Sequence, residues 1–231
     1  MVLEQLRDGA SRQLLGLDKG TKQLIYILCL PLVDGVFASL LVSGAITTFS
    51  ELIATSLTVF SGAGALAVLY SNSKTAEEAK KMVLKAAPFL IGGALLVGLV
   101  APIYAEIFDL GLLRYATGLT LFAIAVQIAD LPYSELLPPQ AVIFTGMVLS
   151  LQSPSALKLG YSYLPEAMLT VSISLVALYA ASYLSKMDMD MRYIRAGGAS
   201  ALTILGLSIF IQLPSMSSLV VLAFSFIASL R

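Results

Sequence analysis

Asp34 is the residue whose type and position could do chemistry, because it stands alone in an otherwise apolar run, LPLVDGVFASLLVSG, over residues 30–44. An aspartate at the centre of a membrane helix costs about 2.5–3.5 kcal/mol on insertion scales, so it should face a cavity or a partner. One interpretation is that Asp34 binds a cation or a proton. The other is that it pairs with a hydroxyl or backbone group and fixes a helix contact. Pro31 favours this second role, because proline frees backbone groups that need partners.

Ser39 and Ser43 continue a pattern that begins next to Asp34. Together with Gly35 and Thr47 they recur every four residues, which places them on one small, polar face of a helix. Small residues at this spacing let helices approach closely, but the same pattern also suits a hydrophilic lining. The sequence therefore predicts Asp34, Ser39 and Ser43 as candidate substrate- or ion-binding residues.

Residue patterns typical of catalysis or of a resident metal are absent from the sequence. Histidine does not occur, which removes the commonest metal ligand and any Ser–His pair. The single cysteine, Cys29, excludes an internal disulfide and a cysteine metal cluster. Neither HExxH nor GxSxG occurs. We therefore predict a protein that is not an enzyme and that has neither a cofactor nor a metal centre.

The composition indicates which environment must surround these residues. Hydrophobic residues make up 58% of 231 positions and charged residues only 12%, whereas a soluble domain has about a quarter of its residues charged. The mean hydropathy is +0.90, and apolar runs reach the ~20 residues that cross a bilayer. The net charge is zero, which gives no electrostatic footprint for nucleic acid. These features predict an all-α, polytopic transmembrane helix bundle in the lipid bilayer.

Eight apolar segments follow a polar N-terminal segment, residues 1–22. The leucines of that first segment share one helix face, which suits either the membrane interface or packing on the bundle. The eight segments lie at about 23–46, 49–71, 82–104, 110–130, 137–153, 165–184, 194–212 and 216–230. The fifth and the eighth are short for complete spans.

Lysine and arginine positions predict the orientation of the bundle. With eight spans and a cytoplasmic N-terminus, every Lys and Arg except Arg114 and Lys158 falls on the cytoplasmic side. The positive-inside rule therefore predicts a multi-pass protein of the cell membrane with both termini in the cytoplasm. The loop at 131–136 fits less well. It should be cytoplasmic, but it has no Lys or Arg, Asp130 directly precedes it, and it contains Glu135.

The second half of the chain resembles the first. PLVDGVFASLLVS, from Pro31, aligns with PPQAVIFTGMVLS, from Pro138, so that the prolines, phenylalanines and final serines coincide. Apolar helices also resemble one another by composition alone. A true duplication predicts two parallel four-helix repeats, 23–130 and 131–231, related by an axis along the membrane normal. The first and fifth helices would then face each other, which adds Gln140 and Thr145 to the candidate site around Asp34.

The run LPLVDGVFASLLVSGAI, followed by TVFSGAGALAVLYS, resembles an uncharacterised family of archaeal polytopic membrane proteins, a domain of unknown function. This resemblance covers most of the chain and implies no activity. The first span is also similar to the LysE-type exporter superfamily, where an acidic residue among small residues serves substrate or metal transport. That similarity implies a transport role for Asp34. It conflicts with the count of spans, because that superfamily is built from three-span halves.

These features together predict an integral membrane transporter of a small solute or ion with a membrane-embedded carboxylate. The alternative is a non-catalytic membrane scaffold or partner subunit in which Asp34 serves helix packing.

Overall fold

The computed structural model describes residues 17–131, 134–153, 159–186, 190–211 and 216–229. These residues are almost entirely helical, and the one β pairing among them is an isolated antiparallel bridge between Phe108 and Leu151. The predicted all-α class is thereby confirmed. Most of the predicted interfacial segment, residues 1–22, lies outside the described residues.

Each predicted apolar segment coincides with one helix or with helices separated by a break. The first segment is α2 plus α3, the second is α4, a π-helical turn η1 and α5, and the other six are α6 to α11. The elements are α2 (Lys19–Val33), α3 (Val36–Val42), α4 (Phe49–Thr55), η1 (Ser56–Phe60), α5 (Ala63–Asn72), α6 (Ala76–Ile107), α7 (Leu110–Ile128), the short 3-10 turn η2 (Ser134–Leu136), α8 (Pro139–Leu149), α9 (Leu164–Ser182), the 3-10 turn η3 (Tyr183–Lys186), α10 (Met191–Ile211) and α11 (Met216–Ser229).

Four of the described helices, α6, α7, α9 and α10, are long and apolar enough to cross a membrane. The α2–α3 and α4–α5 segments pass the same test when each is taken as one span, although they bend by 44° and 45°. Helix α8 has only 11 residues and α11 only 14, fewer than the ~20 that a full crossing needs. The described helices therefore support a membrane-embedded chain with four to six spans, and eight complete spans are not confirmed.

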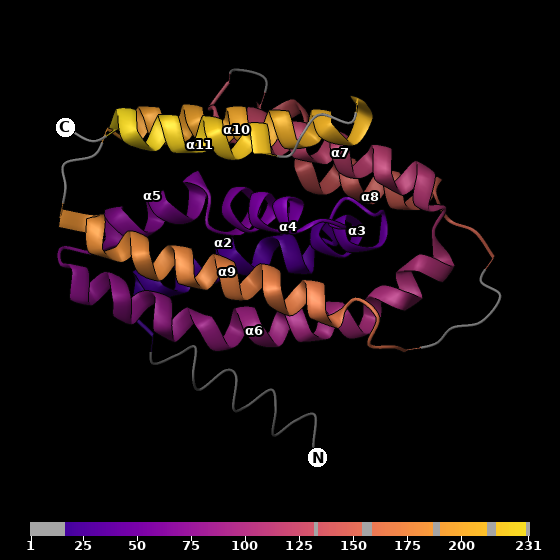
Figure 1. Cartoon of the computed structure of the whole chain (residues 1–231), viewed down its shortest axis with the longest axis horizontal. Coiled ribbons are helices and arrows are strands. Elements are labelled where there is room, and N and C mark those ends of the chain that lie inside the picture. Colours follow the sequence, from indigo (N-terminus) through magenta and orange to yellow (C-terminus); the bar gives the residue numbers. More distant parts are fainter. Residues whose placement is uncertain (1–16, 132–133, 154–158, 187–189, 212–215, 230–231) are drawn as a thin grey trace, which may run out of the picture.

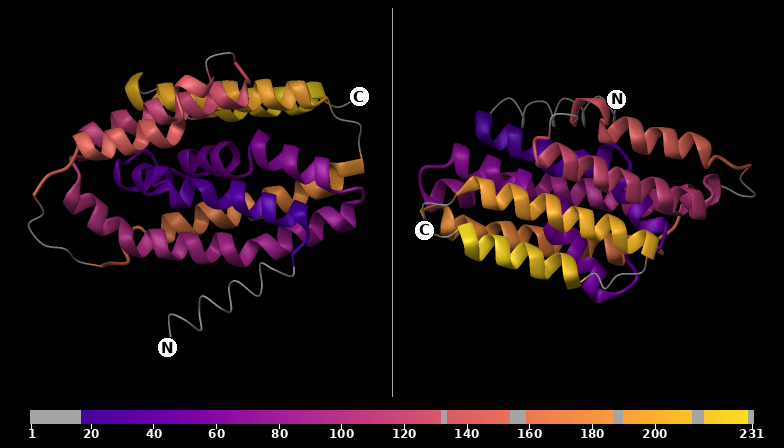
Figure 2. Two further views of the ribbon diagram at one scale, coloured as in Figure 1. Left: turned by 180° about the vertical axis from the view of Figure 1, so that it is seen from behind. Right: turned by 90° about the horizontal axis from the view of Figure 1, so that it is seen from above.

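The two broken segments occupy the middle of the molecule (Figure 1). Helices α2 to α5 lie between α6 and α9 on one side and α7, α8, α10 and α11 on the other, as the view from behind also shows (Figure 2). The most extensive packing joins α6 to α9 and α10 to both α7 and α11. Continuous helices thus enclose the segments whose backbone is interrupted.

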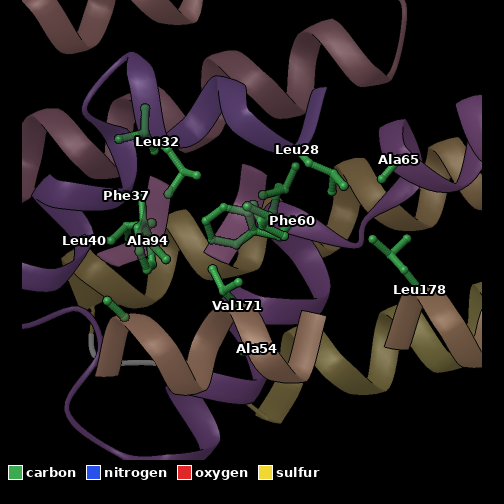
Figure 3. Packing of buried hydrophobic residues seen from close by; sticks show 14 of the residues in the cluster. Leu28, Leu32, Phe37, Leu40, Ala54, Phe60, Ala65, Ala94, Val171 and Leu178 are labelled. Carbon is green, nitrogen blue, oxygen red and sulfur yellow. The ribbon is translucent and has the colours of Figure 1, made fainter. Parts of the chain in front are cut away.

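Large apolar side chains fill the space around the two breaks (Figure 3). Phe37 from α3 and Phe60 from η1 meet edge to face with ring centroids 4.9 Å apart, and both rings are fully buried. Leu28 from α2 and Val171 from α9 belong to the same cluster. Close packing, rather than removal from water, drives helix association in a bilayer, so this cluster holds the broken segments in place.

The first break follows from the sequence Asp34-Gly35. Gly35 has φ of +83°, a left-handed conformation that side chains with a Cβ adopt only with strain. Pro31, in the last turn of α2, has no N–H to donate. Helix α2 therefore ends at Val33, and α3 starts in a new direction.

The second break lies at η1 and the Ser61-Gly62 pair that follows it. The hydroxyls of Ser56 and Thr58 donate to the carbonyls of Leu52 and Ala54, each at 2.6 Å, a pattern that bends helices. From α9, the Ser174 hydroxyl donates to the Ser56 carbonyl at 3.0 Å. The π-helical turn is thus held both from within its own segment and by a neighbouring helix.

Helices α7 and α8 form a hairpin whose two open ends are bonded together. Asp109 N–H donates to the Ser150 carbonyl at 2.7 Å, and Gln152 N–H to the Ile107 carbonyl at 2.8 Å. The far end of α7, at Ala125–Leu131, lies beside Ala199–Ile204 of α10. Ala199 is eight residues after Met191, the first residue of α10. The end of α7 therefore lies roughly 12 Å, at 1.5 Å per residue, from the level at which α10 begins.

The packing of the described helices does not give evidence for two symmetric repeats. Under the predicted repeat, α6 corresponds to α10 and α7 to α11. Helix α7 packs closely on α10, whereas the corresponding pair, α11 and α6, is not among the helix pairs in close contact.

Candidate functional site

A cavity of about 360 Å³ lies where the two helix breaks meet the turn of the α7–α8 hairpin. The first break contributes Pro31 and Asp34. The second contributes Thr58 and Gly62, and the end of α7 and start of α8 contribute Gln127 and Gln140. Leu202, near the middle of α10, closes the cavity. Interrupted helices that meet inside a bundle leave backbone groups able to contact a ligand, which is the arrangement that secondary transporters use.

Asp34 lines this cavity and also bonds to the backbone of the next helix. Its Oδ1 accepts a hydrogen bond from the N–H of Val36, the first residue of α3, at 3.1 Å. Its own N–H donates to the Leu30 carbonyl at 3.0 Å. Within the described residues, no lysine or arginine forms a salt bridge with its carboxylate. The side chain thus brings an ionisable group to the cavity while one of its oxygens supports the start of α3.

The other polar side chains of the cavity differ in their freedom to bind a ligand. The buried Thr58 hydroxyl is committed to the Ala54 carbonyl. The amides of Gln127 and Gln140 are exposed at the edge of the cavity. Gln140 was a predicted site residue, and the structure brings it to the same cavity as Asp34. Gln127 was not predicted, and its only signal was a lone amide close to the end of an apolar run.

Ser39 and Ser43 do not line the cavity. Ser39 is on α3 and Ser43 directly follows that helix. Both are buried, and their hydroxyls have no hydrogen-bond partner among the described residues. The prediction that they extend a polar lining from Asp34 assumed one straight helix. Because the chain bends by 44° at the break, the helix face that continues from Asp34 does not follow the cavity.

Thr145 is also separate from the cavity. It is exposed and lines a groove of about 470 Å³ between α7 and α8, beside Tyr115 and Leu149. Five residues along a helix is a rotation of about 140°, so Gln140 and Thr145 lie on different faces of α8. Of the five predicted site residues, the structure brings Asp34 and Gln140 together and places the other three apart from them.

Acidic residues and cysteine do not gather into a metal site in the part of the chain that the structure describes. No group of three or more such side chains there lies close enough together to hold a metal ion.

A model of DUF5794, a family of unknown function, matches residues 90–210. The chain belongs to this family. The match spans just over half of the chain, from the middle of α6 to the last turn of α10. It includes Gln127 and Gln140, whereas Asp34 and Thr58 precede it. No curated protein and no solved structure matches the chain. The predicted membership of an uncharacterised family is confirmed, and the similarity to LysE-type exporters receives no support from these comparisons.

Proposed function

We propose that this member of DUF5794 is a membrane transporter of a small solute or ion, with Asp34 as its cation- or proton-binding residue. The observation that supports the proposal is the convergence of two helix breaks and one hairpin turn on a cavity that contains a carboxylate. A helix bundle with a purely structural role has no need of three backbone interruptions at one place, and broken helices at a central site are typical of transporters.

We propose in addition that the protein has the predicted membrane orientation and that all eight helical segments lie in the membrane. Both termini lie in the cytoplasm of a cell-membrane protein, and helix α8 enters only part of the membrane as one arm of the α7–α8 hairpin. Transport proceeds as the segments around the cavity move against one another and expose Asp34 to one side at a time. The two halves, 23–130 and 131–231, are the proposed units of that movement, and the lipid bilayer and a small solute or cation are their proposed partners.

Asp34→Asn in proteoliposomes tests the proposal. Asparagine keeps the shape and can still accept a hydrogen bond from Val36, but it removes the charge. We expect proton or solute flux in the native protein and its loss in Asp34→Asn, measured with a pH-sensitive dye trapped in the vesicles. Asp130→Asn is the matched control, since Asp130 is exposed, does not line the cavity, and has a φ of 54° that asparagine tolerates.

The hydrogen bond from Val36 to Asp34 favours a second candidate function, a scaffold or partner subunit in which Asp34 only shapes the break. Asp34→Ala separates the two functions, because it removes the charge and the acceptor together. In the scaffold, Asp34→Ala lowers stability by about 1 kcal/mol, as expected for a lost side-chain-to-backbone hydrogen bond, and Asp34→Asn has no effect on any activity. Undiminished flux in Asp34→Asn would overturn the binding role.

A further inference from the structure

The cavity lies level with the middle of α10, at Leu202, and its exposed lining residues are Gln127 and Gln140. Helices α2 and α8, which border the cavity from opposite sides, do not pack extensively on each other. Both helices run along the same edge of the molecule when it is seen from above (Figure 2, right).

Large apolar and aromatic side chains are exposed on the flank beside these two glutamines. On α2, the residues beside the lining stripe are Tyr26, 67% exposed, and Val33, 82% exposed. Leu136, in the hairpin turn just before α8, is 75% exposed. In a membrane-embedded bundle an exposed apolar flank faces the acyl chains of the lipids. A solute that reaches the cavity from this flank therefore comes from the bilayer itself.

The chemistry of the lining defines what such a solute carries. Apart from Asp34, Thr58, Gln127 and Gln140, the walls are apolar side chains, glycines and prolines. A volume of about 360 Å³ falls in the range of roughly 300–1,000 Å³ typical of small-molecule sites. The carboxylate has no cationic partner among the described residues, so a cationic ligand is able to balance its charge there. Apolar walls, by contrast, suit a ligand that is largely hydrophobic.

We infer that the substrate of this site is a lipophilic organic cation that enters the cavity sideways from the bilayer. The inference rests on the proposed transport function and specifies its substrate class. Asp34 balances the charge of the ligand, the two glutamines hydrogen-bond its polar groups, and the apolar walls hold its body.

Equilibrium binding tests this substrate class without requiring transport. The full chain in lipid nanodiscs is titrated with radiolabelled tetraphenylphosphonium, with empty nanodiscs as the baseline for partition into lipid. We expect saturable binding that ethidium displaces and that a hundredfold excess of guanidinium, a hydrophilic cation, does not. Asp34→Asn should weaken the affinity at least tenfold, whereas Asp130→Asn should change it less than twofold.

The outcomes separate this inference from the proposed function. Displacement by guanidinium, or equal affinity in Asp34→Asn and the native protein, overturns the lipophilic class. Asp34-dependent flux of a hydrophilic cation would overturn it too and leave the transporter proposal intact. Asp34-dependent binding without any flux would support the ligand class and overturn the transport function.

Fluorescence quenching tests the sideways entry itself. Because Cys29 is the only cysteine, Cys29→Ser gives a background in which Gln140→Cys carries a single bimane label. We expect quenching by nitroxides on lipid acyl chains and little quenching by iodide in the water. Ser162→Cys, exposed near the start of α9, is the control that iodide should reach. Stronger quenching of the Gln140 label by iodide than by acyl-chain nitroxides would contradict entry from the bilayer.

Discussion

Gly35 is the residue that sets the direction of the chain at the site. Its positive φ lets α3 start at an angle to α2 immediately after Asp34. It also lies against the end of the flexible Met147 side chain on α8, which would have to move to make room for a Cβ at this position. One glycine thus fixes both the bend of the first segment and its close approach to the hairpin.

Gly35→Ala should destabilise the protein more than Gly44→Ala. Both glycines have positive φ, so each substitution costs roughly 1–2 kcal/mol in backbone strain. Only at position 35 does the new methyl group also meet a neighbouring side chain, since the nearest atom to a Cβ at position 44 is 3.8 Å away. The apparent melting temperatures of the purified variants measure the difference. Equal losses in the two variants would show that Met147 does not constrain Gly35.

The π-helical turn η1 is the element whose geometry depends most on a neighbour. The Ser174 hydroxyl of α9 lies 2.8 Å from the Thr170 carbonyl of its own helix and 3.0 Å from the Ser56 carbonyl of η1, and its one proton is shared between these two acceptors. The Ser56 carbonyl also accepts from the Ser61 N–H at 3.1 Å and from the Ser61 hydroxyl at 3.0 Å, so the donor from α9 adds to bonds within the π-helical segment itself. Helix α9 therefore helps to keep the second break, and with it Gly62, beside the cavity.

Ser174→Ala should lower the stability of the folded chain by about 0.5–1.5 kcal/mol, the contribution of a typical hydrogen bond. The buried Ser56 carbonyl would lose its donor from α9. Thermal unfolding in detergent gives the measurement, and Ser172→Ala, an exposed serine on the same helix, gives the control. A Ser174→Ala variant as stable as Ser172→Ala would mean that η1 does not need this bond.

The sequence predicts the helical segments well because each segment is a local run of apolar residues. Pro31 and Gly35 also mark the first break locally, although the straight-helix assumption led to Ser39 and Ser43 as lining residues. Gln140 is a candidate only through the predicted repeat, which the helix packing does not support, and Gln127 joins Asp34 and Gln140 through tertiary packing, which no local pattern encodes. The 131–136 loop has no Lys or Arg. This agrees with the position of the end of α7, which lies beside the middle of α10 and not at the end of the bundle where the lysines gather.

At the scale of the whole molecule, charged and aromatic side chains gather at one end of the bundle. Lys80 Nζ lies 3.9 Å from the centre of the Tyr183 ring and 2.9 Å from Glu77. In the same region the Tyr70 hydroxyl donates to the Ala181 carbonyl at 3.0 Å. Lysine and tyrosine in this combination are typical of the cytoplasmic membrane interface, which agrees with the orientation we propose.

Single cysteines in the Cys29→Ser background test that orientation. Lys74→Cys, between α5 and α6, should react with a membrane-impermeant maleimide only from the cytoplasmic side. Ser162→Cys, before α9, should react only from the other side, and both positions are exposed. Glu135→Cys, in the hairpin turn, should react more slowly than either, because the turn lies inside the ends of the bundle. Labelling of Lys74→Cys and Ser162→Cys from the same side would invalidate the proposed topology.

The paired ends of α7 and α8 have a mechanical consequence. Two backbone hydrogen bonds join 107–109 to 150–152, so the hairpin is tied together at that end, and a swing of its turn would have to carry α10, which packs along α7. Helix α7 has 19 residues and is therefore roughly 28 Å long. A rotation of only about 10° at the tied end would carry its tip roughly 5 Å on the same helix geometry. That displacement would widen or narrow the gap between Asp34 and the two glutamines while every helix stayed intact.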